Sequence, residues 1–320
     1  MDLGIESEAL ALASPYILGF IGFMYGLLIV FTAIRWNKSQ DVIRNLWTRA
    51  LVSTPLLLLL FGSLEFGSPT WGFMVGIFAL GAHREYCIAI EIEDAGLRMV
   101  SLVVLLALIL IAMNPNLSEI EALTWAGPQG AGLLGASLFA GALGIWAVPI
   151  VQDRSENVTR DVGRAFIGFL LVWFFIHGIF LMHLGAIGVA ACIFAIVTVS
   201  MNDSFALIFG RIFGKHPFRP VLSPKKTWEG VFGGVMMSAI AGYVAQPLFP
   251  TMTAIETAGL GAILAVIGTT GDLMLSALKR DLGLKDWSAM LPGHGGILDR
   301  VDSFILVAPA LYWILLLSGV

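Results

Sequence analysis

The residues best suited to chemistry lie in one stretch, from Gly271 to Ser303, which stands between two apolar runs. Ahead of the pair Arg300 and Asp302, this stretch carries four acidic and three basic side chains. Ionisable side chains in or beside membrane-spanning segments are costly to keep and usually serve a function. The stretch is therefore the candidate active site, with one alternative: its charges only pair with one another at a membrane surface.

Two parts of this stretch have helical spacing. Residues separated by four, three and one positions would form a polar stripe on one side of a helix: Asp272, Ser276, Lys279 and Arg280. Asp299, Asp302 and Ser303 repeat a helical spacing at the start of the last apolar run, and Lys285 and Asp286 lie in a short polar segment between. The sequence thus predicts two helical carboxylates, Asp272 and Asp299, on either side of a basic segment.

A glycine-rich loop lies between the two helical patterns. Three of the five residues from Pro292 to Gly296 are glycines, which permit positive φ and close approach of the backbone to a ligand. We expect Gly295 and Gly296 to line a substrate site. His294 could contact a phosphate or could only support the loop, since histidine both titrates near neutral pH and hydrogen-bonds well.

This combination of side chains predicts a type of reaction. Carboxylates bind Mg²⁺, Lys and Arg bind phosphates, and backbone amides near a helix start add further donors for anions. The stretch therefore predicts phosphoryl or nucleotidyl transfer assisted by Mg²⁺, with a second cation left open. Asp272 and Asp299 are the first choice as metal ligands, and Asp302 is a further one.

A second polar block lies upstream, between residues 200 and 230. Ser223 is a favourable N-cap and Pro224 a favourable first helical residue, so we expect a helix to begin there. The free amides of that first turn, beside Lys225 and Lys226, would bind an anion. The alternative is an ordinary capped helix whose lysines mark the membrane border.

Both blocks resemble the phosphatidate cytidylyltransferase (CDP-diacylglycerol synthase) family. The downstream residues that match its signature are Ser276-Ala-Leu-Lys279-Arg280, Lys285-Asp286 and His294-Gly295-Gly296-Ile-Leu-Asp299-Arg300-Val-Asp302. The upstream matches are Asn202-Asp203, Gly210-Arg211 and Ser223-Pro-Lys225-Lys226-Thr227-Trp-Glu-Gly230. The two blocks cover much of residues 200–303, whereas the N-terminal half resembles the family only in being apolar and polytopic.

The resemblance implies a membrane enzyme that converts CTP and phosphatidate to CDP-diacylglycerol and pyrophosphate. The residues expected to take part in catalysis are Asp272, Asp299, Lys226, Lys279 and Arg280. The residues expected to bind substrate are Asn202, Asp203, Ser223, Lys225, Lys226, Thr227, Lys285, Asp286, His294, Gly295, Gly296 and Arg300. Two alternatives stay open: cytidylyl transfer to another lipid phosphate, such as an isoprenoid or polyprenyl phosphate, and a polytopic transporter.

The bulk composition describes the setting of these motifs. Of the 320 residues, 58% are hydrophobic and only 12% are charged, against about 25% charged in soluble domains. The chain is therefore predicted to be an all-α, polytopic integral membrane protein, not a soluble globule. Its two cysteines, Cys87 and Cys192, suggest no disulfide framework. We expect CTP and bilayer phosphatidate as partners, a homodimer as a further possibility, and no nucleic acid.

About ten apolar segments can be drawn, and nine is the alternative because some are shorter than the ~20 residues that a span needs. They are 15–34, 50–66, 69–83, 98–113, 130–151, 165–182, 184–208, 229–248, 257–278 and 303–320. In particular, whether 50–66 and 69–83 both cross is open. Residues 1–164 form an N-terminal group of helices, and residues 165–320 form a catalytic region that carries both blocks.

The distribution of basic residues predicts the orientation of the chain. With ten spans and both termini outside, all 18 Lys and Arg residues fall on the cytoplasmic side. The acidic N-terminus lacks the basic residues of a signal peptide, so the first apolar segment is expected to be a retained span. We therefore expect an active site on the cytoplasmic side, of the inner membrane if the chain is bacterial.

Overall fold

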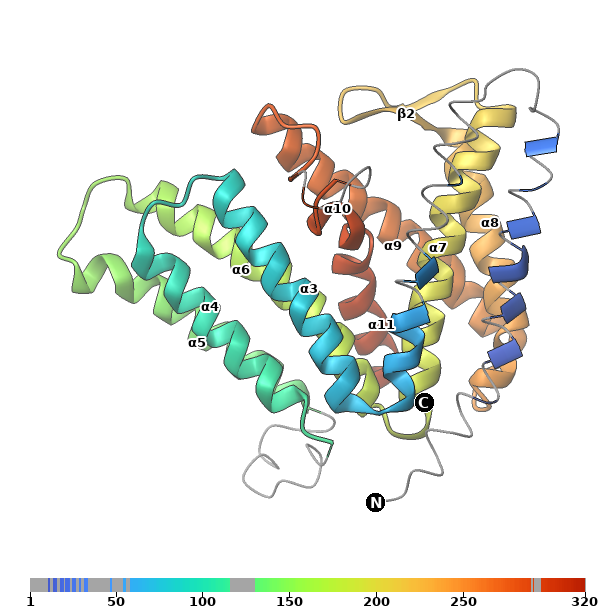
Figure 1. Cartoon of the computed structure of the whole chain (residues 1–320), viewed down its shortest axis with the longest axis horizontal. Coiled ribbons are helices and arrows are strands. Elements are labelled where there is room, and N and C mark those ends of the chain that lie inside the picture. Colours follow the sequence, from blue (N-terminus) through green and yellow to red (C-terminus); the bar gives the residue numbers. More distant parts are fainter. Residues whose placement is uncertain are drawn as a thin grey trace.

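The structure is a computed structural model that describes residues 58–115, 130–288, 290 and 295–319, with short pieces between residues 11 and 55. Helices dominate the described part (Figure 1). The longer helices are α3 (Ser68–Ala89), α4 (Ala95–Ala112), α5 (Ala131–Val151), α6 (Val158–Phe180), α7 (Gly188–Phe213), α8 (Trp228–Val244), α9 (Ala254–Asp281) and α11 (Phe304–Ser318). A four-residue helix, α10 (Leu298–Val301), leads into α11. The prediction of an all-α chain is confirmed, apart from one small hairpin.

Five helical segments in the described part are long and apolar enough to cross a membrane. They are α4, α5, α6 with the turn that follows it, α7 with the turn that precedes it, and α9, and α11 is a shorter apolar helix. The chain is therefore a membrane protein. The count of about ten spans is not confirmed, and much of the segments 15–34 and 50–66 lies outside the described residues.

The helices form two groups that meet at α11 (Figure 1). In the first group, α6 packs against α3, α4 and α5, and in the second, α8 packs against α7 and α9. Helix α11 contacts α6 on one side and α9 and α7 on the other. The predicted boundary between residues 164 and 165 falls inside α6, so the division into two regions stays a prediction. The arrangement places the downstream motif between the two groups.

Glycines permit the close packing of the second group. A Cβ on Gly234 of α8 would collide with Asn202 of α7, and a Cβ on Gly261 of α9 would collide with the backbone of Ser238 of α8. Small residues at such contacts let helix backbones approach within the membrane. The close packing of α7, α8 and α9 brings the upstream block next to the downstream block, where Lys226 pairs with Asp272.

The upstream block contains a β-hairpin where we expected the start of a helix. Strand β1 (Pro217–Arg219) pairs antiparallel with β2 (Ser223–Thr227). Helix α8 begins four residues later than predicted, and its N-cap is Thr227, whose Oγ1 accepts a hydrogen bond from Gly230 N at 3.2 Å. The expectation that Ser223 caps a helix is therefore wrong. Thr227 satisfies the same capping rule, and pairing with β1 keeps the preceding residues extended.

Candidate active site

The described residues among those predicted for the site lie mainly on α7, β2, α9 and α10 (Figure 1). They fall into two clusters, each built around one lysine and one carboxylate. The acidic cluster consists of Asp203, Lys226, Asp272 and Asp302. The loop cluster consists of Lys279, Asp299 and the backbone of residues 285–298. Asp272 and Lys279 both belong to α9, seven residues apart and therefore on nearly the same side of it.

The acidic cluster joins three segments that are distant in sequence. Lys226 on β2 forms an ion pair with Asp272 on α9, and both side chains are about one-fifth exposed, at 23% and 22%. Asp302, just before α11, shares a hydrogen bond with Asp272. Burial, together with the neighbouring carboxylates of Asp272 and Asp203, raises the pKa of Asp302 well above its ordinary value. The cluster therefore holds three carboxyl groups against one lysine.

Two buried oxygens, on the sequence neighbours of Asp203 and Asp302, have no hydrogen-bond partner among the described residues. Asn202 is 2% exposed, and its Nδ2 donates to Thr269 Oγ1 at 3.1 Å and to Asp203 Oδ1 at 3.5 Å, while its Oδ1 is unpaired. The second is Oγ of Ser303, also 2% exposed. Buried polar atoms are nearly always paired, so both oxygens are exceptions. Asn202 Oδ1 lies against α8, since a Cβ on Gly234 would come within 2.5 Å of it, whereas its Nδ2 faces Asp203.

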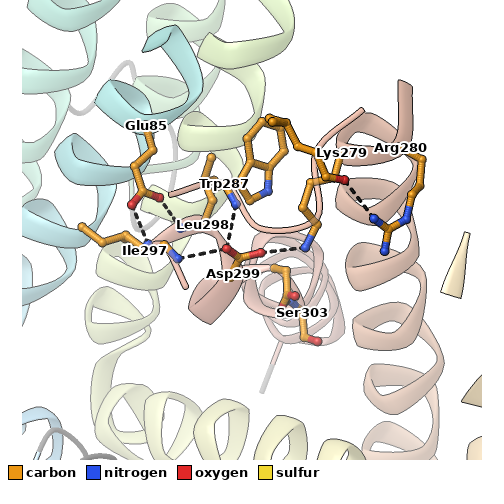
Figure 2. A network of polar contacts seen from close by, with 11 residues as sticks. Glu85, Lys279, Arg280, Trp287, Ile297, Leu298, Asp299 and Ser303 are labelled. Carbon is orange, nitrogen blue, oxygen red and sulfur yellow. Dashed lines mark hydrogen bonds and ion pairs between the residues drawn. The ribbon is translucent and has the colours of Figure 1, made fainter. Parts of the chain in front are cut away.

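The loop cluster is organised by Asp299 (Figure 2). Its Oδ1 accepts a hydrogen bond from Lys279 Nζ at 2.6 Å. Its Oδ2 accepts from the backbone N of Trp287 and of Gly296, both at 2.9 Å. The Asp299 and Lys279 side chains are only 7% and 10% exposed. Asp299 therefore ties the end of α9 to both ends of the glycine-rich loop.

The two carboxylates predicted to share a cation lie in different clusters. Among the described residues, the recorded contacts of Asp272 run to Lys226 and Asp302, and those of Asp299 run to Lys279 and the loop backbone. Nor does the described part contain three or more His, Cys, Asp or Glu side chains placed together to hold a metal ion. A shared cation at Asp272 and Asp299 stays a prediction, since Mg²⁺ commonly uses one or two carboxylates and completes its shell with substrate and water.

The remaining predicted residues occupy several environments. Gly295 has φ +76°, which confirms that the loop uses glycine where other residues would be strained, and its own Cβ position faces Asp299. Arg280 is exposed, and its Nη1 donates to Leu284 O at 2.8 Å. Ser223 and Lys225 lie on β2, Lys285 and Asp286 in the bend after α9, and Arg300 on α10. His294 lies outside the described residues.

One acidic residue at this site was not among the predicted binding or catalytic residues. The sequence predicted it to be half of a surface loop pair with Arg84, and the family resemblance implied at most a minor structural role near the site. Glu85, near the end of α3, is 4% exposed and accepts hydrogen bonds from three donors in the downstream motif. Figure 2 shows two of them, from Ile297 and Leu298. The donors are Ile297 N and Leu298 N, both at 2.9 Å, and Ser288 Oγ at 2.6 Å. The sequence signal was a carboxylate at the end of an apolar segment, where ionisable residues usually have a partner.

Comparison with known proteins shows similarity to phosphatidate cytidylyltransferases. A phosphatidate cytidylyltransferase of Staphylococcus epidermidis is 46% identical over 125 residues, which cover 39% of this chain and 48% of the relative. A phosphatidate cytidylyltransferase of Staphylococcus saprophyticus is 39% identical over 158 residues, or 49% of this chain and 61% of the relative. The uncharacterized protein YnbB of Escherichia coli is 36% identical over 126 residues and 42% of its length.

The alignments with these relatives cover only about half of their length. The match to the family as a whole is longer. The sequence model of the cytidylyltransferase family matches residues 47–318, which include every predicted site residue and α3 through α11. This range is most of the chain, and the chain therefore belongs to the cytidylyltransferase family.

Proposed function

We propose that the chain transfers the cytidylyl group of CTP to phosphatidate, forming CDP-diacylglycerol and releasing pyrophosphate. One observation carries the proposal: the ion pair of Lys226 with Asp272 joins the upstream block to the downstream block. Two blocks that are separate in sequence thus form one charged site in the structure. The relatives named phosphatidate cytidylyltransferase support this choice of nucleotide and lipid.

The site fits Mg²⁺ through its acidic cluster. Asp272 and Asp302 would hold the ion, with Asp203 beside them, because hard cations prefer oxygen donors. When bound, Mg²⁺ would neutralise negative charge on the reacting phosphates. Asp299 is already bonded to three donors, and we propose that it also orients Lys279.

The basic residues supply the rest of the chemistry. Lys226, Lys279 and Arg280 would bind the phosphates of the two substrates, both of which are anions. An oxygen of the phosphatidate phosphate attacks the α-phosphorus of CTP, the bond to the β-phosphate oxygen breaks, and pyrophosphate leaves with the electron pair. The attacking oxygen is already anionic, so no strong general base is needed. Catalysis then depends on positioning and charge neutralisation.

The place of the site at helix ends suits a soluble nucleotide and a lipid. We propose that this end faces the cytoplasm, of the inner membrane if the chain is bacterial, because basic residues mark the cytoplasmic side. Single cysteines at positions 288 and 120 should label from opposite sides of sealed vesicles. Equal labelling from outside would contradict this orientation. Cys87 and Cys192 are buried and should give little background.

The direct test is an assay of the purified full chain with labelled CTP and phosphatidate, with and without Mg²⁺. We expect CDP-diacylglycerol and pyrophosphate in equal amounts, and loss of turnover when Mg²⁺ is chelated. A parallel reaction with polyprenyl phosphate tests the other lipid acceptor. Turnover with that substrate and none with phosphatidate would reject the proposed acceptor while keeping cytidylyl transfer.

A further inference from the structure

We propose that Glu85, which belongs to the first helix group, is a positioning residue for the active-site loop of the second. The inference rests on the proposed function and extends it, because it gives the N-terminal helices a part in the reaction. Glu85 would not touch substrate. Its carboxylate would fix the backbone that carries Asp299, and through Asp299 it would fix Lys279.

The first step is the geometry of the Glu85 carboxylate. Its two oxygens accept from successive backbone amides, Oε1 from Ile297 N and Oε2 from Leu298 N, both at 2.9 Å. Oε1 also accepts from Ser288 Oγ at 2.6 Å, so the same carboxylate binds both sides of the loop. The Glu85 side chain is buried, and a buried carboxylate without hydrogen-bond partners is costly. These three donors therefore stabilise the carboxylate in its position.

The second step is the contact with Gly296. A Cβ at this position would lie 2.6 and 2.7 Å from the two oxygens of Glu85 and 2.9 Å from its carboxyl carbon. Real Cβ atoms essentially never come so close, so a side chain here would displace either the loop or the carboxylate. The loop backbone therefore lies directly against the Glu85 carboxylate.

The third step links Glu85 to the charged residues of the site. Three consecutive amides are divided between two carboxylates: Gly296 N donates to Asp299, whereas the next two donate to Glu85. Asp299 in turn accepts a hydrogen bond from Lys279 Nζ, in the last turn of α9, at 2.6 Å. A shift of the loop would therefore move Asp299, and with it the Lys279 ammonium group.

The test compares Glu85→Gln with a matched control, Glu93→Gln, in the full chain in lipid nanodiscs. Both variants lose one carboxylate, but Glu93 is exposed in the turn after α3 and has no recorded contact with the loop. In Glu85→Gln we expect kcat to fall by about tenfold to a hundredfold, because misplacing a reacting group by about 1 Å can cost that much. We expect the KM for phosphatidate and the melting temperature to stay close to those of the control.

Hydrogen exchange and a double variant separate positioning from simple support of the fold. We expect the amides of Ile297 and Leu298 to exchange faster in Glu85→Gln, and the double variant Glu85→Gln/Asp299→Asn to be no slower in turnover than Asp299→Asn. Unchanged exchange, a kcat equal to that of Glu93→Gln, or fully multiplicative losses would each overturn the proposal.

If Glu85→Gln does not fold, Ser288→Ala removes one of the three donors and takes its place. We then expect a smaller fall in kcat, of roughly threefold, with faster exchange of the same two amides. Exchange as slow as in the unmodified protein would overturn the proposal. Absence of turnover in the unmodified protein would reject the proposed function, whereas the exchange comparison would still decide whether Glu85 holds the loop.

Discussion

The two helix groups each carry a cluster of charges at a helix end, and the clusters differ in composition. In the first group, Arg154 contacts Asp161 at 2.9 Å and Asp94 at 3.4 Å, and Asp94 also caps α4. That cluster joins the ends of α4, α5 and α6. Its two arginines, Arg154 and Arg160, form ion pairs with its two aspartates. In the second group, Lys226 pairs with Asp272, and two further carboxyl groups, Asp203 and Asp302, lie close to that pair.

The difference shows that the number of charges does not by itself identify an active site. Opposite charges that match one another, on short connections, are sufficient to fasten helices together. An excess of buried carboxyl groups over basic groups is costly without a ligand, because burial penalises a charge that has no partner. The second cluster therefore has the properties of a site for a cation and phosphates, and the first has those of a structural contact.

The largest effect should come from Asp272→Asn. Asparagine keeps the size of the side chain and removes its charge, so we expect folding to persist while kcat/KM falls at least a hundredfold. Asp299→Asn should also reduce turnover steeply, and the double variant should lose little more, because the two residues act on one site. Titration of activity against Mg²⁺ measures the effect.

Asp161→Asn is the matched control from the first group, and it should keep near-normal turnover. Near-normal activity of Asp272→Asn at low Mg²⁺ would show that the acidic cluster is as structural as the Arg154 cluster. The comparison between the groups would then fail.

A smaller effect is expected from Lys226→Ala. The loss of a charge-assisted hydrogen bond costs ~1.5–3 kcal/mol, which corresponds to roughly tenfold to a hundredfold in the use of CTP. Steady-state kinetics with varied CTP, normalised to the yield of folded protein, would measure it. Lys215→Ala is the control, since Lys215 is exposed at the end of α7 and is not among the site residues. Equal kinetics for the two variants would remove Lys226 from the nucleotide site.

A still smaller effect is expected from Arg154→Ala, and it should concern stability alone. The Arg154 side chain is 27% exposed, and partly exposed ion pairs contribute about 0–1 kcal/mol each. We expect the melting temperature to fall by a few degrees while kcat and KM stay unchanged. Arg160→Ala, which removes a more exposed partner of Asp161, should have less effect still. A selective loss of kcat in Arg154→Ala would contradict the structural assignment.

Sequence patterns predicted the parts of the site that depend on local rules. The spacing of Asp272 and Lys279 predicted a single helix, and both lie on α9. The glycine-rich loop predicted a positive φ, and Gly295 has one. The polar stripe was only partly right, because Ser276 and Lys279 are buried whereas Arg280 faces outward. Helical spacing defines a common side, but the neighbouring segments determine which of its residues are covered.

The features that the sequence did not predict depend on distant partners. Residues 223–227 form a strand because β1 lies beside them, and capping rules contain no information about that pairing. Glu85 binds backbone amides more than 200 positions away, and backbone amides have no signature in the side-chain pattern. The pairing of Asp272 with Asp302 rather than Asp299 likewise depends on how α9 and α11 pack.

Helix α9 also sets a fixed length between the two clusters. Asp272 and Lys279 are seven residues apart, and a rise of 1.5 Å per residue separates them by about 10 Å along nearly two turns. The spacing is thus held by main-chain hydrogen bonds. Insertions between Ser288 and Gly295 would not change the distance between Asp272 and Lys279, because they fall outside α9, between the anchors at Trp287 and Gly296. Insertion of one residue between Asp272 and Lys279 would instead rotate the two clusters about 100° apart.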